Sequence, residues 1–260
     1  MTSDTRHEAF PEERRVEILR RIEHAGRVSV RELSHAFGVS SVTIRADLQA
    51  LEARRLLTRT HGGAVPVSPL PEISLVLRRQ QQADEKNRIG AAAAAMVGDG
   101  ETIFLDASST SLAMTAHLRQ RQNLTVVTNG LAVAQSFLDA PGVTVVLLGG
   151  ILQRETASMV SLEGAAGLPA ARLQKGFFGA HSFTEAGGLA DASAADAEVK
   201  RQMVKRCRRA IAVLDATKWE WTGLPRYARL QDMQTIITDR RAPRSLVRQV
   251  RSAGVEVILV

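Results

Sequence analysis

The chain has 260 residues, of which 45% are apolar, 23% charged and 4% aromatic, with a formal net charge of +7 and one cysteine. This composition is typical of a globular protein of one or two domains and excludes wholesale disorder. A single cysteine, Cys207, excludes an intrachain disulfide and a thiolate zinc site. We therefore expect no disulfide framework, no metal and no cofactor.

The apolar runs are too short to cross a membrane. The longest, such as Ala91–Val97 and Val143–Leu148, fall far short of the ~20 residues that a spanning helix needs. The first thirty residues carry charges throughout and contain no apolar segment typical of a secretory signal. We expect a cytoplasmic protein without a membrane partner.

The basic excess is spread over the chain. Residues 1–66 contain 11 basic and 9 acidic residues, whereas residues 67–260 contain 23 and 18. Charge alone therefore does not locate a nucleic-acid-binding face.

Before residue 66, apolar residues recur at helical spacing in three groups. These groups are Val16, Ile18, Leu19 and Ile22, then Leu33 and Phe37, then Ile44, Leu48 and Leu51. The segment from Leu57 to Pro66 alternates polar and apolar residues around a glycine pair, which predicts a short β-hairpin. The first 66 residues are thus predicted to form three helices and a hairpin.

The segment from Val28 to Asp47 is typical of a helix-turn-helix. Gly38 can adopt the left-handed conformation that ends the first helix, and Ser40 or Ser41 can cap the second. In such a motif the start of the second helix enters the major groove, while Ile44 and Leu48 face inward. The predicted DNA-binding residues are Ser40, Ser41, Val42, Thr43 and Arg45, with Arg59 and His61 on the hairpin beside the DNA backbone.

Prolines at 66, 69 and 71 indicate a linker after this unit. We predict a DNA-binding domain at residues 1–66, a linker at 67–83 and a second domain at 84–260. In the second domain, helical stretches alternate with short apolar strands, which predicts a parallel sheet covered on both faces. The predicted strands are Thr102–Leu105, Leu124–Val127, Val143–Leu148, Lys175–Gly179, Ala210–Leu214, Thr235–Thr238 and Glu256–Val260. The predicted helices are Lys86–Val97, Thr110–Leu118, Leu131–Leu138, Leu162–Leu173, Ala194–Cys207 and Arg244–Ala253.

Polar or glycine-rich residues follow five of these strands. Ligands of open parallel sheets settle at the carboxyl ends of the strands, so these residues predict a pocket. The loop at 106–111 leads into a helix, where free N–H groups and hydroxyls suit a phosphate, although the same serines can simply cap the helix. The predicted effector-binding residues are Asp106, Ser108, Ser109, Thr110, Thr128, Asn129, Gly149, Gly150, Asp215 and Lys218.

Other polar and aromatic residues admit plainer interpretations. Glu198, Lys200 and Arg201 could contact the effector, but a charged run on a helix favours a solvated face. His181 could bind the ligand or only fill a loop. Trp219 and Trp221 favour a packing role over stacking on a sugar.

The sequence resembles the DeoR family of bacterial transcriptional repressors. The resemblance rests on Thr43, Ile44, Arg45, Asp47 and Leu48, on the hairpin from Arg59 to Ala64, and on the second domain. It departs from the family pattern at Ala46, Arg55 and Ser108, where an Arg, a Gly and a Gly are frequent.

The resemblance implies a winged helix-turn-helix followed by an open, mostly parallel α/β sheet similar to ribose-5-phosphate isomerase and glucosamine-6-phosphate deaminase. It implies no enzymatic activity. The expected function is repression of a carbohydrate catabolic operon, with double-stranded operator DNA and a phosphorylated sugar as partners. A homodimer or homotetramer is expected because helix-turn-helix proteins usually bind paired half-sites. The alternative is a phosphosugar isomerase or deaminase with an accessory DNA-binding module, in which Asp106, Asp215 and Lys218 would be catalytic candidates.

Overall fold

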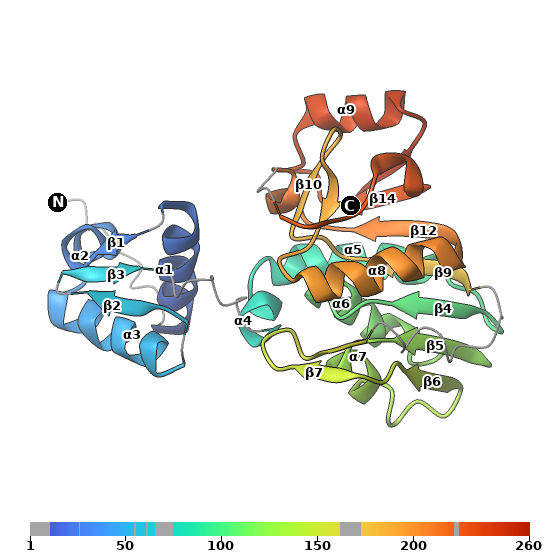
Figure 1. Cartoon of the computed structure of the whole chain (residues 1–260), viewed down its shortest axis with the longest axis horizontal. Coiled ribbons are helices and arrows are strands. Elements are labelled where there is room, and N and C mark those ends of the chain that lie inside the picture. The colour runs from blue at the N-terminus through green and yellow to red at the C-terminus, as the bar shows by residue number, and fades with distance from the viewer. Residues whose placement is uncertain are drawn as a thin grey trace, which may run out of the picture. The chain divides into compact units, whose positions relative to one another are not determined.

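The computed structural model describes residues 11–25, 27–54, 56–60, 62–65, 75–161, 173–220 and 224–260 (Figure 1). The chain divides into two compact units, residues 1–77 and 78–260. Within the described ranges, no helix is long and apolar enough to cross a membrane.

The first unit contains the three helices and the hairpin that the sequence predicts. Its elements are α1 (Pro11–Ala25), β1 (Val28–Ser29), α2 (Val30–Phe37), α3 (Ser41–Ala53), β2 (Thr58–Thr60) and β3 (Gly63–Val65). The apolar positions recognised by their spacing pack into one core that includes Ile18, Leu33, Ile44 and Leu48. The helical period of the sequence therefore identified the buried face of each helix.

The turn between α2 and α3 has the expected chemistry. Gly38 ends α2 with a φ of 66°, a left-handed conformation that favours glycine. Ser40 caps α3, because its side chain accepts a hydrogen bond from the N–H of Thr43. Together the two residues set the direction in which α3 leaves the turn.

The hairpin joins a small antiparallel sheet in the order β1, β3, β2. Strand β3 runs so close to β1 that a Cβ on Gly63 would lie 1.9 Å from the carbonyl oxygen of Val28. Only glycine fits there, which explains one member of the glycine pair. The hairpin is thereby fastened beside α2.

The second unit is built on a seven-stranded, entirely parallel sheet, as predicted. The strand order is β15, β14, β12, β9, β4, β5, β6. The strands are β4 (Thr102–Leu105), β5 (Leu124–Thr128), β6 (Val143–Leu147), β9 (Leu173–Phe178), β12 (Cys207–Val213), β14 (Thr235–Thr238) and β15 (Glu256–Leu259), and each corresponds to a strand expected from the sequence.

Helices cover both faces of this sheet. Successive residues of β4 point to opposite faces, and Ile103, Phe104 and Leu105 are all fully buried. The helices are α5 (Ala83–Ala95), α6 (Ser109–Leu118), α7 (Leu131–Gln135), α8 (Ala194–Arg206) and α9 (Arg244–Ser252), with two short 3-10 turns, η1 (Ala216–Lys218) and η2 (Leu230–Asp232) (Figure 1). Helix α4 (Leu75–Gln80) precedes them and contains the division between the two units.

Some predicted helix boundaries were wrong. Helix α7 ends at Gln135 rather than Leu138. Helix α8 ends at Arg206, and Cys207 begins β12 instead. The helix predicted over Leu162–Leu173 falls on residues 162–172, which lie outside the described residues, and Leu173 itself begins β9.

Two small antiparallel sheets were not predicted. One is the hairpin of β7 (Ile151–Gln153) and β8 (Ser158–Val160). The other joins β10 (Ser182–Thr184), β11 (Gly188–Ala190) and β13 (Arg226–Ala228). Their strands have only three residues each, which is too short for alternation to be recognised in a sequence.

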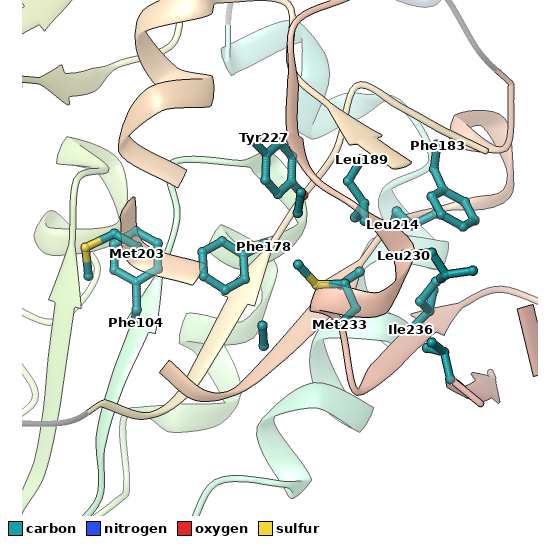
Figure 2. Packing of buried hydrophobic residues seen from close by; sticks show 14 of the residues in the cluster. Phe104, Phe178, Phe183, Leu189, Met203, Leu214, Tyr227, Leu230, Met233 and Ile236 are labelled. Carbon is teal, nitrogen blue, oxygen red and sulfur yellow. The ribbon is translucent and has the colours of Figure 1, made fainter. Parts of the chain in front are cut away.

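A large apolar core lies on one face of the parallel sheet (Figure 2). Phe104 and Phe178 pack with ring centroids 5.4 Å apart, and Tyr227 follows at 6.4 Å from Phe178. Trp219 is buried edge-on against Phe183, so its predicted packing role is confirmed, whereas Trp221 lies outside the described residues. This core holds the strands rigidly beneath the loops at their carboxyl ends.

Candidate functional site

The start of α3 presents the predicted DNA-contacting side chains at the surface. Ser40, Ser41 and Arg45 are exposed, Thr43 is half-buried, and the side chain of Val42 is 71% exposed. Ile44 and Leu48 are buried beneath them, as expected. An exposed Val42 beside polar side chains is suited to contact a thymine methyl group in the major groove.

Two of these residues also serve the helix itself. The hydroxyls of Ser40 and Thr43 lie 2.9 Å apart, and Ser40 Oγ accepts the N–H of Thr43 at 3.1 Å. Arg45 has no ion pair within the described part of the chain. Ser40 and Thr43 therefore shape the helix start, while Arg45 is available to a phosphate or a base.

A shallow groove beside α3 adds residues that the sequence analysis missed. Its lining includes Arg31 and His35 from α2, together with Arg45 and Gly62. Both α2 side chains are exposed. Sequence reasoning assigned neither residue a role, and only the packing of α2 against α3 brings them beside Arg45.

Only part of the hairpin lies among the residues that the structure describes. Arg59 is exposed on β2, its N–H donates to Glu52 Oε1 at 3.0 Å, and its guanidinium lies 3.7 Å from the same carboxylate. His61 lies outside the described residues. Glu52 thus positions Arg59, and the DNA-contact role of both hairpin residues stays a prediction.

Asp47 holds the recognition helix from behind. Its carboxylate is 2% exposed and accepts from Arg14 Nε at 2.6 Å and Arg15 Nε at 2.9 Å, both on α1. This buried pair of contacts fixes α3 against α1. The Asp47 of the family motif is therefore a positioning residue and not a DNA contact.

In the second unit, the predicted effector residues lie at the carboxyl ends of the parallel strands. Asp106 follows β4, Thr128 ends β5, and Asp215 follows β12. The N–H of Gly179, after β9, donates to Asp106 Oδ2 at 2.8 Å, so neighbouring strand ends are in direct contact. Gly149 and Gly150 follow the edge strand β6 and are exposed.

The loop after β4 forms a helix cap. Ser108 Oγ accepts the N–H of Ser111 at 3.1 Å, and Asp106 Oδ1 accepts the N–H of Ser108 at 3.1 Å. Ser109 and Thr110 are buried in the first turn of α6. The hydroxyl of Ser108 is thus occupied within the loop, and contact between the loop and a phosphate stays a prediction.

Asp106 is fully buried and has four donors. Besides Ser108 and Gly179, Ser111 Oγ donates to it at 2.5 Å and Lys200 Nζ lies at 2.7 Å. A carboxylate with every lone pair in use has little capacity to accept from a ligand hydroxyl. Its observed role is to fix the loop and Lys200.

Lys200 contradicts the sequence interpretation of its helix. It was expected on a solvated face, yet it is 4% exposed and forms a second ion pair with Asp191 at 2.5 Å. Burial acts to lower the pKa of Lys200, but the carboxylates of Asp106 and Asp191 hold it well above its ordinary value. Lys200 was not recognised as a buried cation within the charged sequence of α8, because its partners Asp106 and Asp191 come from loops outside that helix.

Further cations gather around His181 at the same strand ends. Burial, followed by the charge of Lys218, lowers the pKa of His181 to about 4, and Arg78 and Lys200 act in the same direction. Burial likewise lowers the pKa of Lys86 to about 8, with Lys218 and Arg78 as cationic neighbours and Asp215 opposing them. The cationic group consists of Arg78, Lys86, Lys200 and Lys218, and sequence reasoning identified only Lys218.

Arg78 has an unused hydrogen-bonding edge. Its Nε and Nη2 atoms are buried and have no hydrogen-bond partner among the described residues. These two nitrogens form one side of the planar guanidinium, the side that binds a carboxylate or phosphate through two parallel hydrogen bonds. A buried donor without a partner is costly, so this edge is suited to an anion.

A second set of unsatisfied atoms is of the opposite kind. Asn129 Oδ1 and Asp196 Oδ2 are buried without a partner among the described residues, and Asn129 Nδ2 lies 3.5 Å from Asp196 Oδ1. Burial and the nearby Asp191 raise the pKa of Asp196. These oxygens are suited to hydroxyl donors. Sequence reasoning predicted Asn129 as an effector-binding residue and missed Asp196.

Asp215 and Lys218 lie together on η1. Asp215 Oδ1 accepts hydrogen bonds from the N–H of Thr217 at 3.0 Å and from the hydroxyl of Thr217 at 2.5 Å. Asp215 is 1% exposed. Lys218 is half-buried. Among the described residues, no three His, Cys, Asp or Glu side chains are grouped so that they could hold a metal ion.

A winged helix-turn-helix followed by an α/β unit with a charged, partly unsatisfied strand-end site defines the class of two-domain, ligand-sensing transcriptional regulators. Comparison with known families agrees: residues 14–69 match the DeoR-like helix-turn-helix domain, and residues 81–240 match the DeoR C terminal sensor domain. The chain belongs to the DeoR family of transcriptional regulators.

Relatives align over nearly the whole chain. The HTH-type transcriptional regulator GolR of Listeria innocua is 33% identical over 95% of this chain and 98% of its own length. The HTH-type transcriptional repressor GlcR of Bacillus subtilis is 32% identical over 96% of each chain. The glycerol-3-phosphate regulon repressor of Escherichia coli is 27% identical over 93% of this chain and 96% of its own.

Among solved structures, a ribose 5-phosphate isomerase A from Methanocaldococcus jannaschii aligns with a TM-score of 0.41 and 15% identity, covering 54% of this chain and 56% of that one. A domain of a possible sugar-binding transcriptional regulator from Arthrobacter aurescens TC1 aligns with a TM-score of 0.35 and 16% identity, covering 69% and 84%.

Proposed function

We propose that this regulator represses a carbohydrate catabolic operon and leaves its operator when a phosphorylated sugar binds the strand-end site of the second unit. The names of relatives support this direction, since one is a glycerol-3-phosphate regulon repressor and another a putative aga operon repressor. In this proposal residues 1–66 bind DNA, residues 67–83 link the domains and residues 84–260 bind the effector, together with Arg78 from the linker.

The observation that carries the effector proposal is the open edge of the Arg78 guanidinium beside Lys86 and Lys218. Cations without enough anionic partners are costly to bury, and a phosphate dianion offsets that cost. The unsatisfied oxygens of Asn129 and Asp196 then supply acceptors for sugar hydroxyls. Phosphate and polyol recognition in one site fits a sugar phosphate.

The observation that carries DNA binding is the exposed start of α3. Ser41, Val42 and Arg45 project from a helix whose other face is buried, as in helices that read a major groove. We infer a homodimer or homotetramer on DNA, because one helix covers only a half-site and symmetric operators place two half-sites about one helical turn apart. Arg59 and His61 would add contacts to the backbone.

The two carboxylates that the enzyme alternative names, Asp106 and Asp215, are both engaged by other groups. Asp106 is saturated by four donors, and Asp215 caps η1. A carboxylate that abstracts a substrate proton must be within hydrogen-bond reach of it and not already committed. The geometry at both positions favours sensing over catalysis.

Two measurements test the proposal. Footprinting of DNA upstream of the protein's own gene, titrated with a panel of sugar phosphates, should show a protected site that one sugar phosphate releases. A thermal-shift screen with the same panel should show concentration-dependent stabilisation by that compound. Lys218→Ala should abolish the thermal shift and spare the footprint, whereas Arg45→Ala should do the reverse. A protein that binds no specific DNA site, or whose footprint no sugar phosphate alters, contradicts the proposal.

A further inference from the structure

Helix α4 contains the point at which the chain passes from one unit to the other. The first unit ends at Leu77 and the second begins at Arg78, both within Leu75–Gln80. Because a helix is rigid over one or two turns, a constraint on its last turn also constrains its first. Groups that hold the end of α4 therefore act on the segment leading to the DNA-binding unit.

Lys86 of α5 holds that end. Its Nζ donates to the carbonyl oxygen of Arg78 at 2.5 Å and to that of Gln81 at 2.7 Å, and the side chain is almost fully buried. Carbonyls in the last turn of a helix have no intrahelical partner, and a cation beside them is favoured by the helix dipole. Lys86 thus satisfies the end of α4 with two of its three N–H donors.

The turn between α4 and α5 is held from the other side as well. Gln82 adopts a φ of 52°, a left-handed conformation that is uncommon for residues other than glycine. Arg241 donates to the side-chain amide oxygen of Gln82 and lies 3.2 Å from the carboxylate of Glu85. Tertiary contacts, and not local preference, therefore maintain this turn.

Arg78 joins this turn to the strand-end site. Its carbonyl is held by Lys86, and two buried nitrogens of its guanidinium have no hydrogen-bond partner among the described residues. The positive charge of the same guanidinium acts on His181 at the strand ends. Lys86 itself interacts with Asp215 and Lys218, the two predicted effector residues on η1. The backbone of Arg78 is thus bound by Lys86, while its guanidinium contributes charge to the strand-end site.

We propose that Arg78 and Lys86 form a clamp through which occupancy of the strand-end site by a phosphate group controls α4, and hence the connection to the DNA-binding unit. The inference rests on the proposed effector site and adds its regulation. An anion on the free edge of Arg78 supplies a contact that only the bound state has, which is what a ligand needs to shift a conformational equilibrium. The bound phosphate and Lys86 then hold Arg78 from two directions.

Hydrogen exchange of the full-length protein tests the clamp directly. Without ligand, Lys86→Met should speed exchange of the amides in residues 78–86 by about threefold or more, because the carbonyls of Arg78 and Gln81 lose their donor. Lys86→Arg keeps the charge, so its exchange rate in residues 78–86 should lie between the rates of the wild type and Lys86→Met. Unchanged exchange in Lys86→Met overturns the clamp whether or not any effector is known.

The second arm uses inorganic phosphate and ribose 5-phosphate as probes. In the wild type, each should slow exchange both in the strand-end loop at residues 106–111 and in residues 78–86. Arg78→Lys keeps the charge but removes the two-pronged edge, so it should lose the slowing in residues 78–86 and retain part of it in the loop. Arg79→Lys, at an exposed neighbouring position on the same helix, is the matched control and should behave as the wild type.

The outcomes separate the two proposals. If the loop responds to the probes but Arg78→Lys leaves the response of residues 78–86 intact, the clamp is wrong and the effector site stands. If neither probe nor any member of the sugar phosphate panel affects the wild type, the effector site is wrong and the clamp falls with it. Slowing in residues 78–86 that depends on Arg78 and not on Arg79 supports both.

Discussion

The two units use their charges in opposite ways. In the first unit, Arg45 and Arg59 are exposed and the buried Asp47 is fully paired with Arg14 and Arg15. In the second, Lys86 and Lys200 are buried, and buried donors of Arg78 have no partner among the described residues. Exposed cations suit a polyanion that is reached from outside, whereas buried, underpaired cations suit a small anion that enters the protein.

The two units also differ in the free energy that their charged side chains cost the folded state. An exposed arginine costs almost nothing to maintain, so its function can be removed without loss of stability. A buried cation depends on its carboxylate partners, and removing one side of such a pair leaves the other uncompensated. Substitutions in the second unit should therefore affect stability and function together, and those on the DNA face should affect function alone.

The largest effect is expected at Lys200. Lys200→Met leaves the buried carboxylates of Asp106 and Asp191 unpaired and should lower the free energy of unfolding of the second unit by about 3–5 kcal/mol. Urea denaturation measures this change. The control is Arg201→Met, one residue further along α8, whose half-exposed pair with Glu198 should be worth less than about 1 kcal/mol. Equal effects of the two variants would show that Lys200 is not the buried charge of this site.

His181 should make the stability of the second unit depend on pH between about 4 and 6.5. Its folded pKa is about 4, below the ordinary 6.5, so between these values the unfolded state binds more protons and stability rises with pH. A pKa lowered from 6.5 to about 4 corresponds to roughly 3 kcal/mol of stability, which is fully lost below pH 4. Thermal unfolding from pH 4 to 7 of the wild type and His181→Asn should show a shallower slope in the variant. Parallel slopes would contradict burial of a neutral imidazole.

Asp47 tests the buried charge cluster that it forms with Arg14 and Arg15 in the first unit. Asp47→Asn removes the negative partner of Arg14 and Arg15 and should destabilise that unit by roughly 2–4 kcal/mol, because Arg14 is buried. Operator affinity should fall as α3 loses its fixed position, while the thermal response to sugar phosphates should be unchanged. A variant that unfolds the second unit instead would show that the two units are not independent in stability.

Substitution of Arg45 is expected to weaken DNA binding without changing the stability of the protein. Arg45→Ala should weaken operator binding by about 5- to 150-fold at fixed salt, which corresponds to the 1–3 kcal/mol of a good arginine contact to DNA, with no change in melting temperature. Fluorescence anisotropy with labelled operator DNA measures the affinity. Gln49→Ala, exposed on the same helix, is the control. If Arg45→Ala changed the free energy of unfolding more than the free energy of operator binding, Arg45 would not be a DNA-contacting residue.

The sequence predicted regular structure better than it predicted charged contacts. All seven strands of the parallel sheet were recognised, because strands buried on both faces appear as continuous apolar runs. Strands β10, β11 and β13 were missed because three residues carry no readable period. Lys200 was misjudged because one buried lysine does not change the polar pattern of α8.

For the DNA-binding unit, the sequence by itself determined nearly everything: apolar spacing, the cap at Ser40 and the left-handed Gly38 act between residues close together in the chain. For the sensing unit it determined the strands and the strand-end positions. Only the tertiary structure decided which of the described lysines and arginines are buried and which lack a partner among the described residues. The reason is physical: the charge state and pairing of Arg78, Lys86 and Lys200 depend on carboxylates and carbonyls that other loops and helices bring to them, and no local pattern records those encounters.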